Sequence, residues 1–151
     1  DEAIKIPLII HWPDNTEVNH VIDMPVSNVD IYPTILNMLE LDKPEAVSFQ
    51  GNDLSKIITG NEKETTEPVF AQYNMENFGI AYLRMVRKED WKLVRRFGLG
   101  AKSDLVDELY NLENDPGEQN NLISKSDYQS KRSELEQLLN DWMIKISDPA
   151  L

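Results

Sequence analysis

Six apolar residues near the C-terminus recur at the spacing of one helix face. The residues that follow this amphipathic pattern are Leu135, Leu138, Leu139, Trp142, Met143 and Ile146. A helix with a single apolar face must bury that face against another layer of the protein. We therefore expect a C-terminal helix that packs on a sheet formed earlier in the chain.

The sequence before this helix predicts an antiparallel sheet. Runs rich in β-branched and aromatic residues occupy positions 69–73, 80–87, 91–97 and 108–112. Lys88-Glu89-Asp90 is short enough to join the second and third runs as a hairpin. Alternation places Arg84 and Val86 on the face opposite to Met85, so one face should meet a core and the other should be partly wet.

The N-terminal apolar run has a different character. Residues 4–10 are almost continuously apolar, which is typical of a strand buried on both faces of an α/β sheet. Nothing before this run supplies a neighbouring strand, so the chain is expected to begin within a domain. A helix should follow from Asp30 as its cap and end by Lys43-Pro44. Its expected apolar face consists of Ile31, Ile35, Met38 and Leu39.

A boundary is expected between these two parts of the chain. Residues 42–68 are rich in Pro, Gly, Asn, Thr and Glu, and they contain one apolar patch at Leu54, Ile57 and Ile58. This composition indicates a linker with a single helical turn. The expected fold class is therefore α+β, with an antiparallel sheet and a C-terminal helix preceded by the last strand and helix of an α/β domain.

Composition excludes several classes of function. The net charge is −12, from 27 acidic and 15 basic side chains, and a surface this acidic repels nucleic acid. No apolar run approaches the roughly 20 residues that span a bilayer, so no membrane partner is expected. The chain has no cysteine, which excludes disulfides, thiolate zinc sites and a cysteine nucleophile. Its location is not determined by these residues.

The polar residues form no recognisable catalytic or metal-binding constellation. His11 and His20 are nine positions apart and belong to no zinc motif. The acidic stretch 111–118 alternates oxygen ligands as a calcium loop does, but Pro116 and Leu122 occupy the positions where an EF-hand requires Gly and Glu. A solvated turn is the favoured interpretation. The sequence thus offers no candidate catalytic, cofactor-binding or metal-binding residue.

Positive charge gathers in the hairpin. The basic residues concerned are Arg84, Arg87, Lys88, Lys92, Arg95 and Arg96. They could bind a sulfate or a sulfated sugar, because guanidinium groups bind tetrahedral oxyanions well. They could instead pair with neighbouring acids on the wet face of the hairpin, which is the interpretation we favour. Trp91 and Phe97 are expected in the core rather than on a sugar-stacking platform.

Several strings in this chain occur in the order and spacing of a known family. They are Ile6-Pro7-Leu8-Ile9-Ile10-His11-Trp12-Pro13, Val29-Asp30-Ile31-Tyr32-Pro33-Thr34-Ile35-Leu36, Arg84-Met85-Val86-Arg87 followed by Asp90-Trp91-Lys92-Leu93-Val94, and the most specific, Glu108-Leu109-Tyr110-Asn111-Leu112-Glu113-Asn114-Asp115-Pro116-Gly117-Glu118-Gln119-Asn120-Asn121-Leu122. Together they resemble the last third of a sulfatase, within the alkaline phosphatase-like superfamily. The resemblance implies that residues 1–60 end the α/β catalytic domain and that residues 61–151 form the C-terminal subdomain.

The resemblance also implies a mechanism that this segment cannot perform alone. Sulfatases use a formylglycine, made from the Cys or Ser of a CxPxR or SxPxR motif, together with calcium. Neither motif occurs in this chain, and the family's metal ligands would lie before Asp1. The parent enzyme is expected to be periplasmic or secreted and to hydrolyse sulfate esters of sugars or aryl compounds. The segment itself is expected to be inactive, to support the catalytic domain and to line part of the substrate cleft. Residues 74–77 are one candidate wall of that cleft, although an ordinary connecting loop is the interpretation we favour for them.

Two other functions and one assembly remain open. The chain could be an independent module that binds anionic carbohydrate through the basic hairpin. It could also belong to a related phosphonate or phosphodiester hydrolase, because these enzymes share the fold. A homo-oligomer could form through the first strand if that strand is exposed.

Overall fold

The computed structural model describes residues 4–16, 20–75, 81–97 and 106–150. The chain divides into two compact units. One comprises Asp1–Lys5 and Glu67–Leu151 and contains the sheet, and the other comprises Ile6–Thr66. Within the described ranges, no helix has the length and apolar character needed to cross a membrane.

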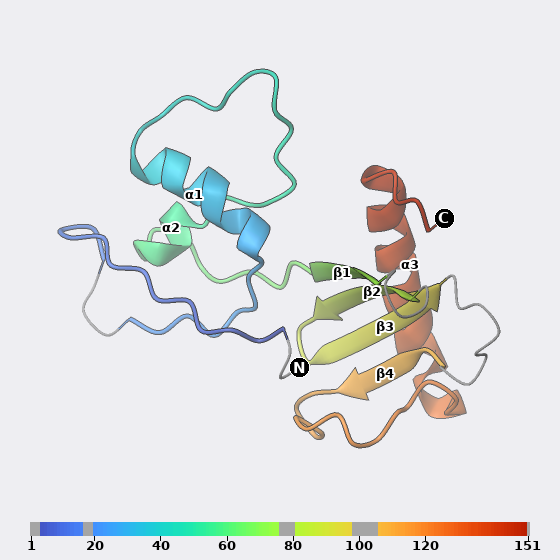
Figure 1. Cartoon of the computed structure of the whole chain (residues 1–151). Coiled ribbons are helices and arrows are strands. Elements are labelled where there is room, and N and C mark those ends of the chain that lie inside the picture. The colour runs from blue at the N-terminus through green and yellow to red at the C-terminus, as the bar shows by residue number, and fades with distance from the viewer. Residues whose placement is uncertain (1–3, 17–19, 76–80, 98–105, 151) are drawn as a thin grey trace. The chain divides into compact units, whose positions relative to one another are not determined.

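Four antiparallel strands form the sheet of the larger unit (Figure 1). The strands are β1 (Val69–Met75), β2 (Ala81–Lys88), β3 (Trp91–Phe97) and β4 (Glu108–Asn111), and they are hydrogen-bonded in the order β1-β2-β3-β4. Lys88 pairs with Trp91, so β2 and β3 are joined by a two-residue turn. Glu89 adopts a φ of 54° in this turn, a left-handed conformation that allows so tight a reversal. The predicted sheet and hairpin are confirmed.

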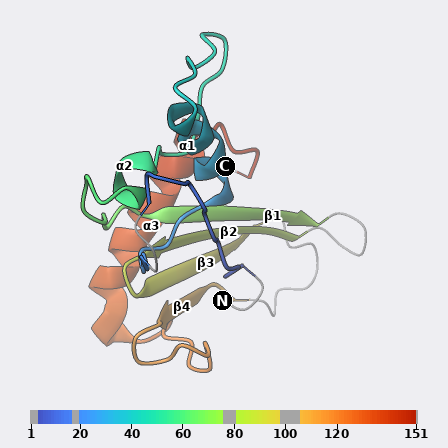
Figure 2. The same cartoon turned by 90° about the vertical axis from the view of Figure 1, so that its left-hand side faces the viewer.

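The C-terminal helix covers one face of this sheet (Figure 2). Helix α3 (Gln129–Lys145) follows the short 3₁₀ helix η2 (Ser126–Tyr128). The fully buried core consists of Val86, Leu93, Leu109, Leu135, Leu139 and Met143. Trp142 of α3 stacks on Phe70 of β1 with ring centroids 5.0 Å apart. The helix predicted from apolar spacing is therefore confirmed, and Trp91 and Phe97 pack against the core as expected.

The smaller unit contains two short α-helices. Helix α1 (Ile31–Met38) follows the 3₁₀ turn η1 (Asn28–Asp30), and helix α2 (Ser55–Ile58) is the single helical turn expected in the linker. The apolar residues of α2 form a small core with Leu54. The helix beginning near Asp30 is confirmed, but its expected apolar face is not the face that is buried in this unit. Ile31, Ile35 and Leu39 are exposed, whereas Pro33, Thr34 and Leu36 are buried.

The strand expected over residues 4–10 does not form. These residues form no β-strand, and Ile6 and Ile9 expose 75% and 90% of their surface. A strand exists only when a neighbour accepts and donates its backbone hydrogen bonds, and within the described residues no other segment pairs with this one. The apolar pattern of residues 4–10 therefore suits a buried strand, but no described segment of this chain forms a sheet with it.

Candidate functional site

The basic side chains of the hairpin are bound by acids. Lys88 Nζ lies 3.0 Å from Glu134 Oε1, and Lys92 Nζ lies 2.6 Å from Glu118 Oε1. Two further pairs join β3 to the start of β4, and they are Arg95–Asp107, at 3.4 Å, and Arg96–Glu108. Acids of the same chain thus neutralise these positive charges. The interpretation that the hairpin charges pair with neighbouring acids agrees with the structure.

Arg84 is different, because its guanidinium is fully buried. Its Nε and Nη2 atoms donate to the two carboxylate oxygens of Asp148, with Nη2 2.7 Å from Oδ1. Its Nη1 atom donates to Asn74 Oδ1 at 2.7 Å. The Oδ1 atom of Asp148 also accepts from the backbone N–H of Ala150 at 2.9 Å. The hydrogen bonds from Arg84 lower the pKa of Asp148, so this carboxylate stays ionised.

This buried pair joins the segment after α3 to strands β1 and β2. The sequence reasoning placed Arg84 among the hairpin cations and did not identify Asp148. A signal was available for Arg84, because it alternates with Val86, which belongs to the core. No local signal marks Asp148, which lies 64 residues away in the chain.

The most specific family-like string builds the outer edge of β4 and the turn beyond it. The backbone N–H of Leu109 donates to Asn121 Oδ1 at 3.0 Å, and Leu109 O accepts from Leu122 N at 2.8 Å. The carboxylate of Asp115 accepts from the N–H groups of Gln119 and Asn120, and these bonds lower its pKa. The acidic stretch is therefore a hydrogen-bonded turn that folds the chain back along β4.

The neighbouring titratable groups do not form an acid–base site. Burial raises the pKa of Tyr110 to about 12, and the nearby Glu108 carboxylate adds to the shift. The phenol is therefore protonated throughout the physiological range and cannot act as a base there. Burial acts to raise the pKa of Glu118, but the hydrogen bond from Lys92 and the attraction of nearby positive charges, including that of Lys92, together lower it more, and the net shift is downward.

In the second family-like string, Asp30 and Thr34 form a network of hydrogen bonds to residues 52–54, and we call this network the lock. The carboxylate of Asp30 accepts from the backbone N–H of Ser27 and of Asn52, both at 2.7 Å. The Thr34 hydroxyl accepts from Leu54 N at 2.9 Å and donates to Asp30 O at 2.6 Å. Asp30 therefore does not cap α1 with its own side chain, as the sequence suggested, but ties the start of the helix to residues 52–54.

Gly51 lies where the chain passes this lock, and we expect Gly51→Ala to disrupt it. A Cβ at this position would lie 2.1 Å from Val29 O, which is a backbone atom and cannot move aside cheaply. The substitution should lower the local stability of this region by about 1–3 kcal/mol. The loss would be measured as faster amide hydrogen exchange at Asn52 and Leu54. Gly117→Ala is the matched control, because its Cβ would meet only the flexible side chain of Gln119 at 3.6 Å. Unchanged exchange in Gly51→Ala would contradict the lock.

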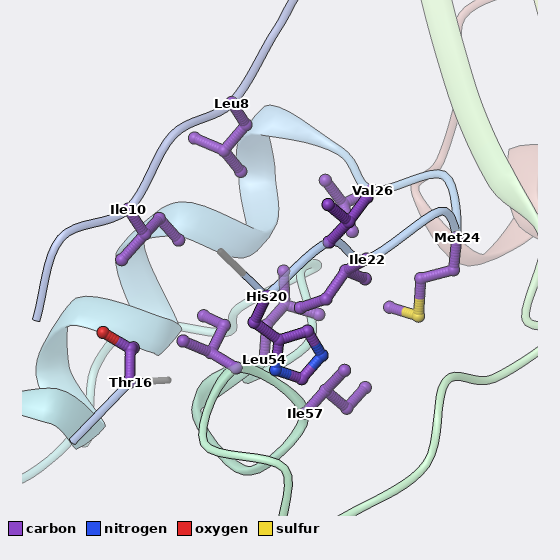
Figure 3. Close-up of a pocket in the computed structure, with 11 residues that line it drawn as sticks. Leu8, Ile10, Thr16, His20, Ile22, Met24, Val26, Leu54 and Ile57 are labelled. Atoms are coloured by element: carbon purple, nitrogen blue, oxygen red, sulfur yellow. The ribbon is translucent and has the colours of Figure 1, made fainter. Parts of the chain in front are cut away.

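An apolar cavity of about 300 Å³ also lies within the smaller unit (Figure 3). Its lining is aliphatic except for Thr16, His20 and Met24. The cavity does not bring the two histidines together, because His11 is not among the lining residues. Within the described ranges, no three His, Asp or Glu side chains gather as metal ligands would.

The remaining sequence candidate is the loop 74–77. Asn74 and Met75 end β1, and residues 76 and 77 lie outside the described residues. Asn74 is exposed, yet its side-chain oxygen is held by Arg84. The structure therefore fixes one polar side chain at the start of the candidate cleft wall.

Fold and motif together define a class of protein. A four-stranded antiparallel sheet covered by one C-terminal helix, with the string 108–122 closing its edge, is the C-terminal architecture that the sulfatase resemblance implied. The family model described as "N-sulphoglucosamine sulphohydrolase, C-terminal" matches residues 1–145. The chain belongs to this family of sulfatase C-terminal regions.

Individual relatives and a solved structure agree with this assignment. An uncharacterised sulfatase of Escherichia coli, YidJ, is 32% identical over 99% of this chain and 28% of its own length. An N-acetylglucosamine-6-O-sulfatase of Bacteroides thetaiotaomicron is 26% identical over 98% of this chain and 26% of its own length. The crystal structure of a putative sulfatase from the same species matches 79% of this chain and 25% of its own, with a TM-score of 0.67 and 25% identity. The chain thus spans little more than a quarter of the curated relatives it matches.

Proposed function

We propose that this chain is the C-terminal portion of an enzyme that hydrolyses sulfate esters of sugars or aryl compounds. The observation that carries the proposal is a match over residues 1–145 to a family of sulfatase C-terminal regions, combined with relatives nearly four times as long. One of these relatives is by name an N-acetylglucosamine-6-O-sulfatase, which favours a sulfated sugar as the substrate class.

In this proposal the reacting groups belong to the rest of the parent enzyme. The chain has no cysteine and no SxPxR motif from which a formylglycine could be made. The described residues also hold no cluster of carboxylates that would fit calcium, which takes oxygen ligands. Formylglycine and calcium are therefore assigned to the parent, and no residue of this chain is given a catalytic role.

The role we assign to this chain is support of the catalytic domain. Twelve of the fifteen large apolar side chains that are exposed in the described residues lie between Ile4 and Val47. Side chains of this type are stable when another layer covers them, so this concentration favours a covering partner. We assign residues 1–60 to the end of that catalytic domain and residues 61–151 to the C-terminal subdomain, with residues 4–10 forming a strand in the parent's sheet.

A smaller contribution to the substrate cleft is also proposed. Asn74 is a polar, exposed side chain whose orientation is fixed by a buried guanidinium. Such a fixed amide suits hydrogen bonding to a sugar hydroxyl. The hairpin cations do not favour the alternative of an independent anion-binding module, because acids already pair with Lys88, Lys92, Arg95 and Arg96.

The test compares the isolated chain with the full product of its gene. We expect the full product to release sulfate from 4-methylumbelliferyl sulfate or from a sulfated glucosamine, and the 151-residue chain to release none. Retention of the isolated chain on immobilised heparin at physiological salt would favour the binding-module alternative. Sulfate release by the isolated chain would overturn the assignment of the nucleophile to the parent.

A further inference from the structure

We propose that the outer edge of β1 is a pairing site for the same strand of a second copy of this chain. The two β1 strands would run antiparallel about a two-fold axis at Gln72. This inference rests on strand geometry and chemistry and is independent of the proposed sulfatase activity. The proposed oligomer contact therefore lies on β1 and not on residues 4–10, because residues 4–10 do not form a strand.

The register of the hairpin determines which backbone groups of β1 point outward. Lys88 and Trp91 flank a two-residue turn, so they are a hydrogen-bonded pair whose polar groups face each other. Hydrogen-bonding direction alternates along each strand, so Arg87 faces β1 and pairs with Val69. The N–H and C=O groups of Phe70, Gln72 and Asn74 must then point away from the sheet.

The same alternation can be checked at the opposite edge. It predicts that Leu109 of β4 points outward, because its neighbour Tyr110 faces Lys92 of β3. Both outward groups of Leu109 are bound there, by Asn121 and Leu122. In the described part of the chain, no hydrogen bond reaches the outward backbone groups of β1. Among the described residues, one edge of the sheet is therefore closed by a motif, and the other is open.

The composition of β1 lacks the features that protect open edges. Natural edge strands usually carry lysine, an inward charge or proline, which prevent pairing with other chains. Residues 69–75 contain none of these, in a protein in which 28% of residues are charged. The nearest charges in the sequence, Glu67 and Glu76, lie outside the strand. A seam formed by β1 alone therefore brings no charged side chains of the two copies opposite each other.

A second copy fits this edge because an antiparallel edge is self-complementary. With the axis at Gln72, the two Gln72 residues form a hydrogen-bonded pair, and each Phe70 pairs with Asn74 of the other copy. All outward groups are then satisfied by about six hydrogen bonds. The outward-pointing positions bring together neutral side chains only, so no like charges oppose each other.

The first measurement is the mass of the intact chain by light scattering over a range of concentrations. We expect the mass to double as concentration rises. Gln72→Pro should remain monomeric, because proline removes an outward N–H without removing a bond to β2. Ile9→Lys is the matched control, since it alters a highly exposed apolar side chain of the smaller unit and should leave the dimer intact. A wild-type chain that is monomeric up to about 0.5 mM overturns the proposal.

Amide hydrogen exchange then identifies the seam residue by residue. In the monomeric Gln72→Pro variant, unchanged protection of Val69, Ala71 and Tyr73 would show that the sheet has folded. In the wild type, protection of Phe70, Gln72 and Asn74 should increase at least about tenfold from dilute to concentrated solution. A dimer in which these three amides exchange freely at high concentration would place the contact elsewhere and would also overturn the proposal.

Discussion

Asp148→Ala should lower the free energy of unfolding of the sheet–helix unit by about 3–5 kcal/mol. The substitution leaves the guanidinium of Arg84 fully buried and without its charged partner. It also removes the acceptor of the Ala150 N–H, which holds the segment after α3. Urea unfolding followed by tryptophan fluorescence measures the loss, because Trp91 and Trp142 both pack on the core of this unit.

Two comparisons separate the unpaired charge from the loss of a side chain. The double variant Arg84→Met with Asp148→Leu should recover most of the stability, because no buried charge remains. Glu134→Ala breaks half-exposed pairs with Lys88 and Lys131 and should cost no more than about 1 kcal/mol. If Asp148→Ala cost no more than Glu134→Ala, the buried pair would not hold the C-terminal segment.

The effect of Asp148→Ala should depend on pH in one direction. The hydrogen bonds from Arg84 lower the pKa of Asp148 below its ordinary value of 3.8. A carboxylate with a lowered folded-state pKa contributes stability that is fully present above the unfolded-state pKa and is lost as pH falls through the folded-state value. The difference between wild type and Asp148→Ala should therefore be constant near neutral pH and shrink below about pH 4.

Leu139→Ala should cost about 2–5 kcal/mol in the same unfolding experiment. Leu139 is fully buried on α3 and packs in the cluster that contains Val86, Leu93 and Leu109 from three strands. Removing its three distal carbons loses burial and leaves a cavity that the rigid sheet cannot fill completely.

Ile144→Ala on the same helix is the control for this prediction. Ile144 is 66% exposed, so its truncation should change stability by less than about 0.5 kcal/mol. The two variants lose the same number of heavy atoms, and they differ mainly in burial. Equal effects would show that α3 does not pack on the sheet through the face containing Leu139.

The regular elements of the larger unit could be predicted because their signals are local. The recurrence of Leu135, Leu139 and Met143 predicted the helix face, and alternation in residues 80–97 predicted the hairpin. The turn chemistry of Asp115-Pro116-Gly117 likewise predicted a turn rather than a calcium site. Each of these inferences uses residues close together in the chain, where backbone geometry fixes which side chains share a face.

The candidate site was predictable mainly in what the chain lacks. Counting residues showed that no cysteine or SxPxR motif is present, which assigns the nucleophile to the parent in our proposal. Composition could not show which cations of the hairpin form ion pairs with acids of the same chain. The partners of Lys92 and Arg95 became evident only when the strands and the turn after β4 were placed together.

The sequence by itself determined the sheet, the C-terminal helix and the family, because these depend on periodicity and on short strings read in order. Tertiary structure alone decided that Arg84 and Asp148 meet across 64 residues. It alone also showed that, among the described residues, no segment pairs with residues 4–10 and one edge of the sheet is closed while the other is open. The physical reason is that a local pattern specifies which face or conformation a residue prefers. Whether a partner is present to satisfy its hydrogen bonds, charge or apolar surface depends on residues distant in the chain.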